Sequence, residues 1–288
     1  MNLSRRQMLK LSAGTAATWI AGTGWTRQAG AAAKAAAKAK VSLGLELWSV
    51  RQLCEKELPK VLKAVAEMGY QAVELAHSYY GHDAPAWKKL LDENGLKSCG
   101  MHMGLPALQG EAFDKTVEIH KLLGTPYLII ASLPKKNLAS AKAIAETGKL
   151  FNELSERLKP HGMQIGYHCH GGDFAKVDGR TAWELFGEST QADVLLQLDI
   201  GNCLGGGGDA IGMLKKFPGR SVSIHIKDHG GKPGFVFGEG TVNWTEVFQI
   251  CETTGGTKQY VIEEEGRAGA QALEDVRRAI QNFRKMGK

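Results

Sequence analysis

The feature that most constrains this chain is a regular alternation of short apolar runs with amphipathic stretches, which begins at Val41 and continues to the C-terminus. The runs have the composition of strands, and the stretches between them have the spacing of helices. Eight strands are expected, over residues 41–47, 71–75, 96–102, 126–131, 163–169, 194–199, 221–227 and 259–264. A helix is expected after each, over residues 55–68, 85–94, 111–123, 137–159, 180–188, 208–217, 243–254 and 270–285. Glycines common at helix ends follow five of them, at Gly69, Gly95, Gly124, Gly162 and Gly255.

Eight strand–helix units over residues 41–288 predict an α/β fold, a single-domain (β/α)8 TIM barrel. The alternative is an open, doubly wound sheet. That sheet is disfavoured because no G-x-G-x-x-G motif follows the first expected strand. The glycine run at 205–208 lacks the Lys-Ser/Thr pair of a phosphate-binding loop, so we expect a flexible loop there.

Residues 1–40 differ in composition from the rest of the chain. They contain seven Lys or Arg residues and no acidic residue. The pair Arg5 and Arg6, the weakly apolar stretch after it and the small residues that follow resemble a twin-arginine export signal. A Sec-type signal and an uncleaved tail are the alternatives. We therefore expect an export signal and linker over 1–40, cleaved around 30–33, and a periplasmic catalytic domain over 41–288.

Charge and apolar content exclude two classes of partner. The whole chain carries a formal charge of +6, but residues 41–288 hold 29 basic and 30 acidic residues. A nearly neutral domain gives no electrostatic basis for binding nucleic acid. No run after the leader approaches the roughly 18 apolar residues of a membrane span, so no stable span is expected after processing. Five widely spaced cysteines without a C-x-x-C motif give no sign of a disulfide framework or structural zinc site.

Alternation along each strand sorts the residues by face, because one set of side chains points into the barrel and the other packs under the helices. In the seventh strand Ile224 and Ile226 are outward, whereas His225 and Lys227 are inward. The same rule turns several other ionisable side chains inward near the C-terminal ends of strands: Glu74, His102, His168, His170, Asp199, Glu263 and Glu265. The C-terminal face is where TIM barrels carry their active sites.

Four successive strands, the fifth to the eighth, thus end in inward His, Asp, His and Glu residues. Burying unpaired charges together costs several kcal/mol, so such a set is expected to bind something. Imidazoles with carboxylates suit Mn²⁺, Zn²⁺, Co²⁺ or Fe²⁺. The rule does not decide whether His168 or His170 contributes from the fifth strand.

Seven stretches together resemble the xylose isomerase-like TIM-barrel superfamily, in particular its sugar phosphate isomerase/epimerase family. They are LGLELWSVR (43–51), MGYQAVELA (68–76), GYHCH (166–170), LQLDIGN (196–202), SIHIKD (223–228), FGEGTVNW (237–244) and YVIEEE (260–265). The resemblance implies one divalent metal ion, with Mn²⁺ first and Zn²⁺, Co²⁺, Fe²⁺ or Mg²⁺ as alternatives. Its implied ligands are His168, Asp199, His225 and Glu263, with His170 the competitor for the first place.

The chain departs from this family at one informative position. In the ketose epimerases of the superfamily, the fifth-strand ligand is a glutamate that also acts as a catalytic base, whereas here His168 stands in its place. Histidine-rich fifth strands resemble the inosose dehydratase branch. An imidazole can still act as a base near neutral pH. This replacement favours an elimination reaction and does not exclude an isomerisation.

The expected function is a metal-dependent sugar or keto-sugar isomerase or epimerase, which removes a proton next to a metal-bound carbonyl and passes through an enediolate. A lyase or dehydratase acting on a keto-sugar or 3-keto-glycoside is the first alternative, and a non-catalytic periplasmic sugar-binding protein is the second. A nuclease on this barrel is disfavoured by the neutral domain. A homo-oligomer is left open.

The expected site residues fall into two groups besides the metal ligands. The catalytic residues are Glu263, His170 and Lys227. The substrate-binding residues are Glu74, His102, Trp48, Asn202 and Glu265. For Lys227 the alternative is a salt bridge to Glu265 or Glu74, and for Trp48 it is a place in the core.

Overall fold

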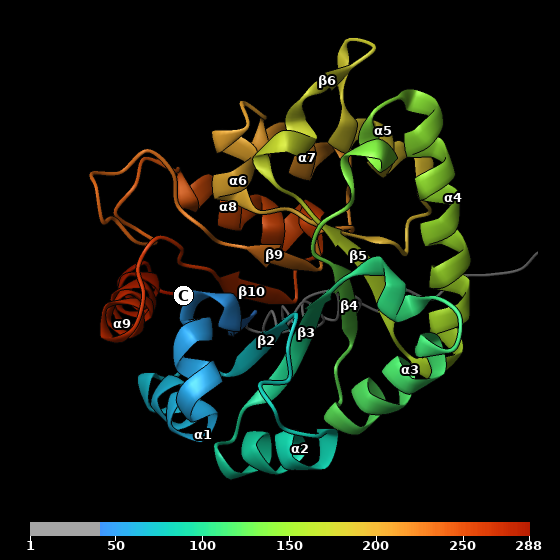
Figure 1. Cartoon of the computed structure of the whole chain (residues 1–288). Coiled ribbons are helices and arrows are strands. Elements are labelled where there is room, and N and C mark those ends of the chain that lie inside the picture. The colour runs from blue at the N-terminus through green and yellow to red at the C-terminus, as the bar shows by residue number, and fades with distance from the viewer. Residues whose placement is uncertain (1–40) are drawn as a thin grey trace, which may run out of the picture. The chain divides into compact units, whose positions relative to one another are not determined.

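The computed structural model describes residues 41–288, so the predicted export signal and its cleavage site lie outside the described residues. Figure 1 shows a ring of strands surrounded by helices. The strands of the ring are β1 (Ser42–Glu46), β2 (Ala72–Ala76), β3 (Lys97–Met103), β4 (Tyr127–Ile130), β5 (Gln164–His168), β8 (Leu195–Gln197), β9 (Ser223–His225) and β10 (Gln259–Ile262). They run parallel, in the order β8-β5-β4-β3-β2-β1-β10-β9. The predicted single-domain (β/α)8 barrel is confirmed.

The ring closes between β8 and β9, where the pairing is shortest. A single parallel bridge joins Asp199 to His225. Two backbone hydrogen bonds flank it, from Leu196 N to Arg220 O at 3.0 Å and from His225 N to Leu198 O at 3.0 Å. The closing seam therefore lies beside two of the predicted metal ligands.

Helices follow the strands close to their expected places. They are α1 (Arg51–Met68), α2 (Ala84–Glu93), α3 (Ala112–Leu123), α4 (Ala141–Leu158), α5 (Ala182–Ser189), α6 (Ile200–Gly205), α7 (Ala210–Lys216), α8 (Trp244–Ile250) and α9 (Ala270–Lys285). Short 3₁₀ turns cover Leu47–Val50, Leu105–Leu108, Lys135–Leu138, Lys159–His161 and Gly171–Phe174, and a π turn covers Cys251–Gly255. None of the helices within residues 41–288 combines the length and apolar character needed to cross a bilayer.

Three local differences from the expected elements have clear causes. The short helix α6 was not expected; it begins because the Asp199 side chain accepts a hydrogen bond from Asn202 N at 2.6 Å. A hairpin of β6 (Lys176–Val177) and β7 (Arg180–Thr181) precedes α5, which starts at a Thr181–Glu184 capping box. The left-handed residue after the seventh unit's helix is Gly256 rather than Gly255.

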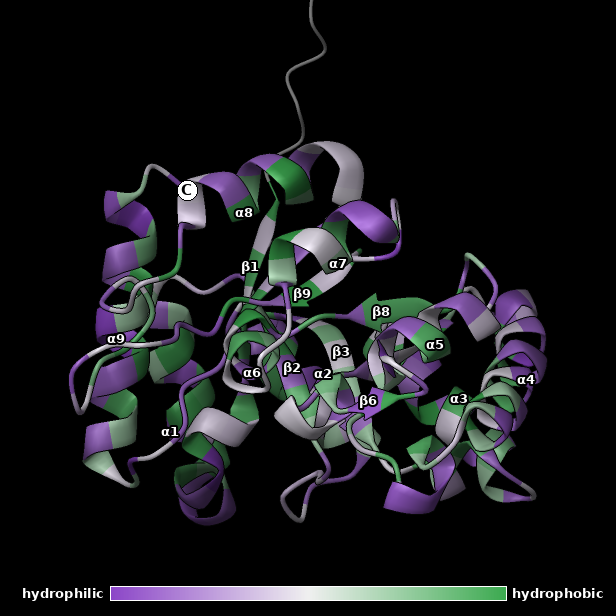
Figure 2. Cartoon of the chain, turned by 90° about the horizontal axis from the view of Figure 1, so that it is seen from above, coloured by the Kyte–Doolittle hydropathy of each residue, from purple (hydrophilic) through white to green (hydrophobic). Residues whose placement is uncertain are grey.

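The apolar core lies between the strands and the helices, and hydrophobic residues gather on the strands and inner helix faces in Figure 2. A smaller set, Ala72, Cys99 and Val261, packs inside the barrel. Glu74 and Glu263 follow Ala72 and Val261 by two residues, so they continue the same inner face toward the C-terminal end. The barrel thus carries an apolar floor below a polar layer.

Candidate metal centre

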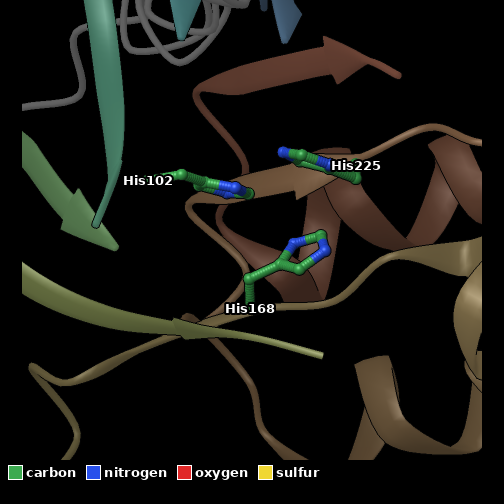
Figure 3. Close-up of side chains that lie close together, drawn as sticks. All are labelled: His102, His168 and His225. Atoms are coloured by element: carbon green, nitrogen blue, oxygen red, sulfur yellow. The ribbon is translucent and has the colours of Figure 1, made fainter. Parts of the chain in front are cut away.

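A polar layer fills the C-terminal end of the barrel, with side chains from almost every strand. Its members are Glu46, Glu74, His102, His168, Gln197, Asp199, Ser223, His225 and Glu263, none more than 5% exposed. Figure 3 shows three of them, His102, His168 and His225, close together. The rings of His102 and His225 stack with centroids 5.1 Å apart, and His168 lies 4.7 and 4.5 Å from them.

The structure brings the four predicted metal ligands together. His168, Asp199, His225 and Glu263 each offer one ligand atom, and these atoms lie within 4.8 Å of one another. His225 Nδ1 lies 3.2 Å from Glu263 Oε2 and 3.8 Å from Asp199 Oδ2. This set of two imidazoles and two carboxylates suits a divalent transition-metal ion. Whether these residues hold an ion stays a prediction.

One atom of this group gives an independent reason for a cation. Asp199 uses Oδ1 to cap α6, and its other oxygen, Oδ2, is buried without a hydrogen-bond partner. A buried carboxylate oxygen without a partner costs free energy unless a positive charge faces it. The residues therefore fit a divalent cation.

A second group of acids and imidazoles adjoins the first through His225. Glu46, Glu74, His102 and His225 also bring ligand atoms within 4.8 Å of one another. Most of these atoms are already engaged, because Glu74 Oε2 lies 2.6 Å from His225 Nε2 and 3.3 Å from His102 Nε2. Glu46 Oε2 is the exception, since it is buried without a partner.

Sequence reasoning left Glu46 out of the predicted site. Glu46 ends β1 and stands opposite Glu74 on β2 in the strand register. The alternation rule was enough to find it, because Leu45 and Leu47 pack outward and a side chain between them must point inward. Gln197, two residues before Asp199, has the same inward parity but was not predicted as a site residue.

Burial and charge set the protonation of the layer. Burial disfavours a charged His225, but hydrogen bonds to Glu263 and Glu74 outweigh it and raise its pKa to about 10. Burial, with Glu263 adding to it and Lys227 opposing it, raises the pKa of Asp199 to about 7. Burial and the neighbouring His225 and His102 hold the pKa of His168 well below its usual range. Without a cation, the carboxylates of Glu263 and Glu74 thus favour the charged form of His225.

Lys227 lies at the rim of the layer with acids on both sides. Its Nζ is 3.8 Å from Glu263 Oε2 and 3.4 Å from Asn202 Oδ1, and it forms an ion pair with Glu265. Burial works against its charge, but attraction to Glu263 and Asp199 raises its pKa above the usual value. Lys227 therefore forms the salt bridge to Glu265 and also lies next to Glu263, the predicted base.

A small cavity opens above the polar layer. Its volume is about 160 Å³, and it is lined by Glu46, Trp48, His77, His102, Ala131, Ser132, His168, His170, Glu263 and Glu265. His170 is exposed there, with its ring centroid 5.0 Å from that of His168. Besides Glu263 and Lys227, six catalytic or substrate-binding residues were predicted. Four of them line the cavity: Trp48, His102, His170 and Glu265. Glu74 and Asn202 are not among the residues that line it: Glu74 is fully buried, and the side-chain nitrogen of Asn202 donates to Cys169 O at 3.1 Å.

The loop after β9 is organised by Asp228, which sequence reasoning also missed. Its carboxylate accepts from Gly238 N at 2.8 Å, Gly240 N at 3.1 Å and the indole N–H of Trp244 at 2.9 Å. These bonds hold the loop next to Lys227. Trp244 is therefore a buried part of this support.

Comparison with known proteins matches the chain to one family. Residues 62–286 match the family described as xylose isomerase-like TIM barrel. An inosose dehydratase of Geobacillus kaustophilus is 24% identical over 193 residues, which span 59% of this chain and 61% of that relative.

Solved structures share the fold. A sugar phosphate isomerase/epimerase from Parabacteroides distasonis superposes with a TM-score of 0.74 at 24% identity, over 85% of this chain and 94% of that chain. A probable 3-DHS dehydratase from Bacillus anthracis superposes with a TM-score of 0.63 at 15% identity, over 84% of this chain and 98% of that chain. The solved structures that share this fold thus include proteins named as isomerases and a protein named as a dehydratase.

Proposed function

The chain belongs to the xylose isomerase-like TIM barrel family, and from that premise we propose that it is a divalent-metal-dependent sugar or keto-sugar isomerase or epimerase. The observation that carries the proposal is the buried group His168, Asp199, His225 and Glu263, with its unpartnered Asp199 oxygen. Mn²⁺ is the first choice of ion. The resemblance to this family noted in the sequence is supported by the match to residues 62–286.

The residues around the cavity have distinct tasks in this reaction. A cation bound by the four ligands supplies Lewis-acid polarisation of the substrate carbonyl. Glu263 removes the proton from the neighbouring carbon, and the electron pair of that C–H bond forms the double bond of an enediolate. The ammonium of Lys227, 3.8 Å from Glu263 Oε2, stabilises the oxygen that gains charge.

The second half of the reaction, the return of a proton, takes place at the mouth of the cavity. In an isomerisation, His170 gives a proton to the former carbonyl carbon, and the hydroxyl proton of the neighbouring carbon passes to the oxygen that had gained charge. In an epimerisation, His170 gives a proton to the opposite face of the carbon that lost one, and the original carbonyl forms again. Trp48, His102 and Glu265 line the space in which the sugar binds.

A second candidate function is dehydration of a keto-sugar or 3-keto-glycoside. The first step is the same, but the enediolate then expels a β-hydroxyl or other leaving group, to which His170 gives the proton. The observation that favours it is the histidine at the fifth-strand position, His168, together with the inosose dehydratase and the probable 3-DHS dehydratase among the similar proteins.

The test combines metal analysis with solvent exchange. Purified protein is reconstituted with Mn²⁺ and incubated in D₂O with a panel of keto-sugars and 3-keto-glycosides, followed by NMR. We expect about one ion per chain and deuterium at the carbon next to a carbonyl. New sugar isomers identify the isomerase, and loss of a hydroxyl or glycoside identifies the lyase. Sugar binding without deuterium uptake would instead identify the non-catalytic binding protein.

We also propose that the chain is exported through the twin-arginine route and acts in the periplasm. The support is the pair Arg5 and Arg6 in a leader without acidic residues. Replacing both arginines with lysine should hold the precursor in the cytoplasm. Unchanged export of that double variant would refute the proposal.

A further inference from the structure

Gln197 occupies the centre of the polar layer and is fully buried on β8. Its side-chain oxygen lies 2.7 Å from His102 Nε2 and 3.0 Å from His168 Nδ1. Its side-chain nitrogen lies 2.9 and 3.2 Å from the two oxygens of Glu74 and 3.0 Å from Ser223 Oγ. One amide thus contacts both imidazoles, a carboxylate and a hydroxyl.

The carboxylate decides which way the amide points. If the amide were turned over, its carbonyl oxygen would face the oxygens of Glu74, and neither side would carry a hydrogen. The NH₂ group must therefore face Glu74, to which it donates. Glu74 is in turn held by His225 Nε2 at 2.6 Å, so the orientation is fixed from both sides.

The orientation of the amide then decides where the imidazole hydrogens are. A carbonyl oxygen only accepts hydrogen bonds, so both ring nitrogens that face it must carry hydrogen. These are Nε2 of His102 and Nδ1 of His168. The nitrogen left free to bind a cation is therefore Nε2 of His168. His102 keeps Nδ1 free, 4.0 Å from Glu46 Oε1 at the cavity.

We propose that Gln197 is a positioning residue that holds His168 in the tautomer whose Nε2 is free to bind a divalent cation. An amide suits this task because it accepts from two imidazoles without adding negative charge beside Glu74. His168 and Gln197 are paired in the strand register, so the contact is built into the barrel itself. The inference rests on the proposed function, since it assumes a cation at His168.

The first experiment reads the ring hydrogens directly. The full chain, labelled with ¹⁵N-histidine and stripped of metal, is studied by long-range ¹H–¹⁵N correlation NMR. We expect hydrogen on Nδ1 of His168 and on Nε2 of His102. Adding Zn²⁺ should shift the Nε2 resonance of His168. Hydrogen on His168 Nε2 before addition, or a Zn²⁺ shift at Nδ1, would overturn the inference without reference to any variant.

The second experiment uses a matched pair of variants. Gln197→Met removes both carbonyl contacts, and Zn²⁺ affinity should fall roughly 10–100-fold, as for other residues that orient a metal-binding histidine. Ser223→Ala removes one contact to the amide nitrogen and leaves both carbonyl contacts, so its tautomers and affinity should match the wild type. Equal Zn²⁺ affinity in wild type and a folded Gln197→Met variant would also overturn the inference.

Failure of the two proposals can be told apart. Wild-type protein that takes up no Zn²⁺ or Mn²⁺ refutes the proposed function and, with it, the role of Gln197. Wild-type protein that binds the ion, but with the other His168 tautomer, refutes the role of Gln197 alone.

Discussion

His168 and His170 stand two residues apart but occupy different layers of the barrel. His168 is 2% exposed and touches the amide of Gln197, within the polar layer. His170 is exposed at the cavity, and its backbone N–H donates to Asp173 Oδ2 at 2.8 Å. The two imidazoles therefore have different surroundings, which favours different tasks.

Alanine substitutions should separate these tasks. His168→Ala removes a ligand and should lose the bound ion, whereas His170→Ala should keep the ion and lose turnover or substrate affinity. His168→Glu should keep the ion, because a carboxylate is an acceptable ligand for the same metals. Elemental analysis and steady-state kinetics provide the measurements. Reversed phenotypes would move the ligand to His170.

The ligands on the neighbouring strands allow a comparable check. Asp199→Asn and His225→Ala should each abolish bound metal in elemental analysis and leave the circular dichroism spectrum largely unchanged. His225 is the more demanding case, because its ring also contacts Glu74. Metal content equal to that of the wild type in both variants would contradict the ligand assignment.

At this scale the alternation of side chains along strands was the informative signal. It placed His168, Asp199, His225 and Glu263 on one face, and the structure brings them together. It could not reveal that Glu74 lies below the cavity while His102 reaches it, because depth along the barrel depends on strand register. The register shifts between β2 and β3 beside Glu74, where Gly100 is its partner. A glycine inside a strand is compatible with such a shift but does not fix its position.

Among the elements, α3 carries a buried histidine outside the site. His120 is 0% exposed; its Nε2 pairs with the Tyr79 hydroxyl at 3.0 Å, and its Nδ1 has no partner. Burial lowers the pKa of His120 to about 4. The folded protein thus keeps this imidazole neutral at a pH where the unfolded chain is protonated.

This difference predicts loss of stability in mild acid. The unfolded chain takes up the proton on His120 near pH 6.5, and the folded chain takes it up near pH 4. The free energy of unfolding is therefore undiminished by this residue above pH 6.5 and falls as the pH drops from 6.5 to 4. The loss amounts to about 3 kcal/mol at most. His120→Gln should flatten urea-unfolding free energies between pH 7.5 and 4.5 relative to the wild type. Parallel profiles for the two proteins would contradict this.

The element boundaries followed from local signals where capping residues were present. Gly69, Gly124 and Gly162 end helical segments in the left-handed conformation, as expected. Helix α6 was not predicted because its sequence, IGNCLG, has weak helical propensity. The helix depends on its cap, Asp199, which also belongs to the site. The residue that begins the helix is the residue that the metal prediction uses.

For the whole molecule, the ligands lie on both sides of the closing seam. His168 and Asp199 come from β5 and the end of β8, while His225 and Glu263 come from β9 and the end of β10. An ion held by all four would join the two sides where backbone pairing is shortest. Binding to the folded chain alone stabilises it, by about 2.7 kcal/mol at 100 times the dissociation constant.

Metal removal should therefore act locally as well as globally. EDTA treatment should lower the melting temperature and speed amide hydrogen exchange in peptides covering 194–199 and 223–226, and Mn²⁺ should reverse both. The amides expected to exchange faster include that of His225, which donates to Leu198 O. A peptide from β3, distant from the seam in the strand order, serves as the control. Equal exchange with and without Mn²⁺ at the seam would contradict the prediction.

The position of the four ligands along the chain bears on how the protein is made. All of them lie between residues 168 and 263, and the last follows β10, which docks beside β1. A growing chain that has produced only the first four strands carries none of them, and one that stops before β10 lacks the fourth. Metal loading during synthesis can thus be complete only after the final strand has emerged and the first strand has found it. The ion would distinguish finished chains from half-barrels, which expose unpaired strand edges and are prone to aggregate.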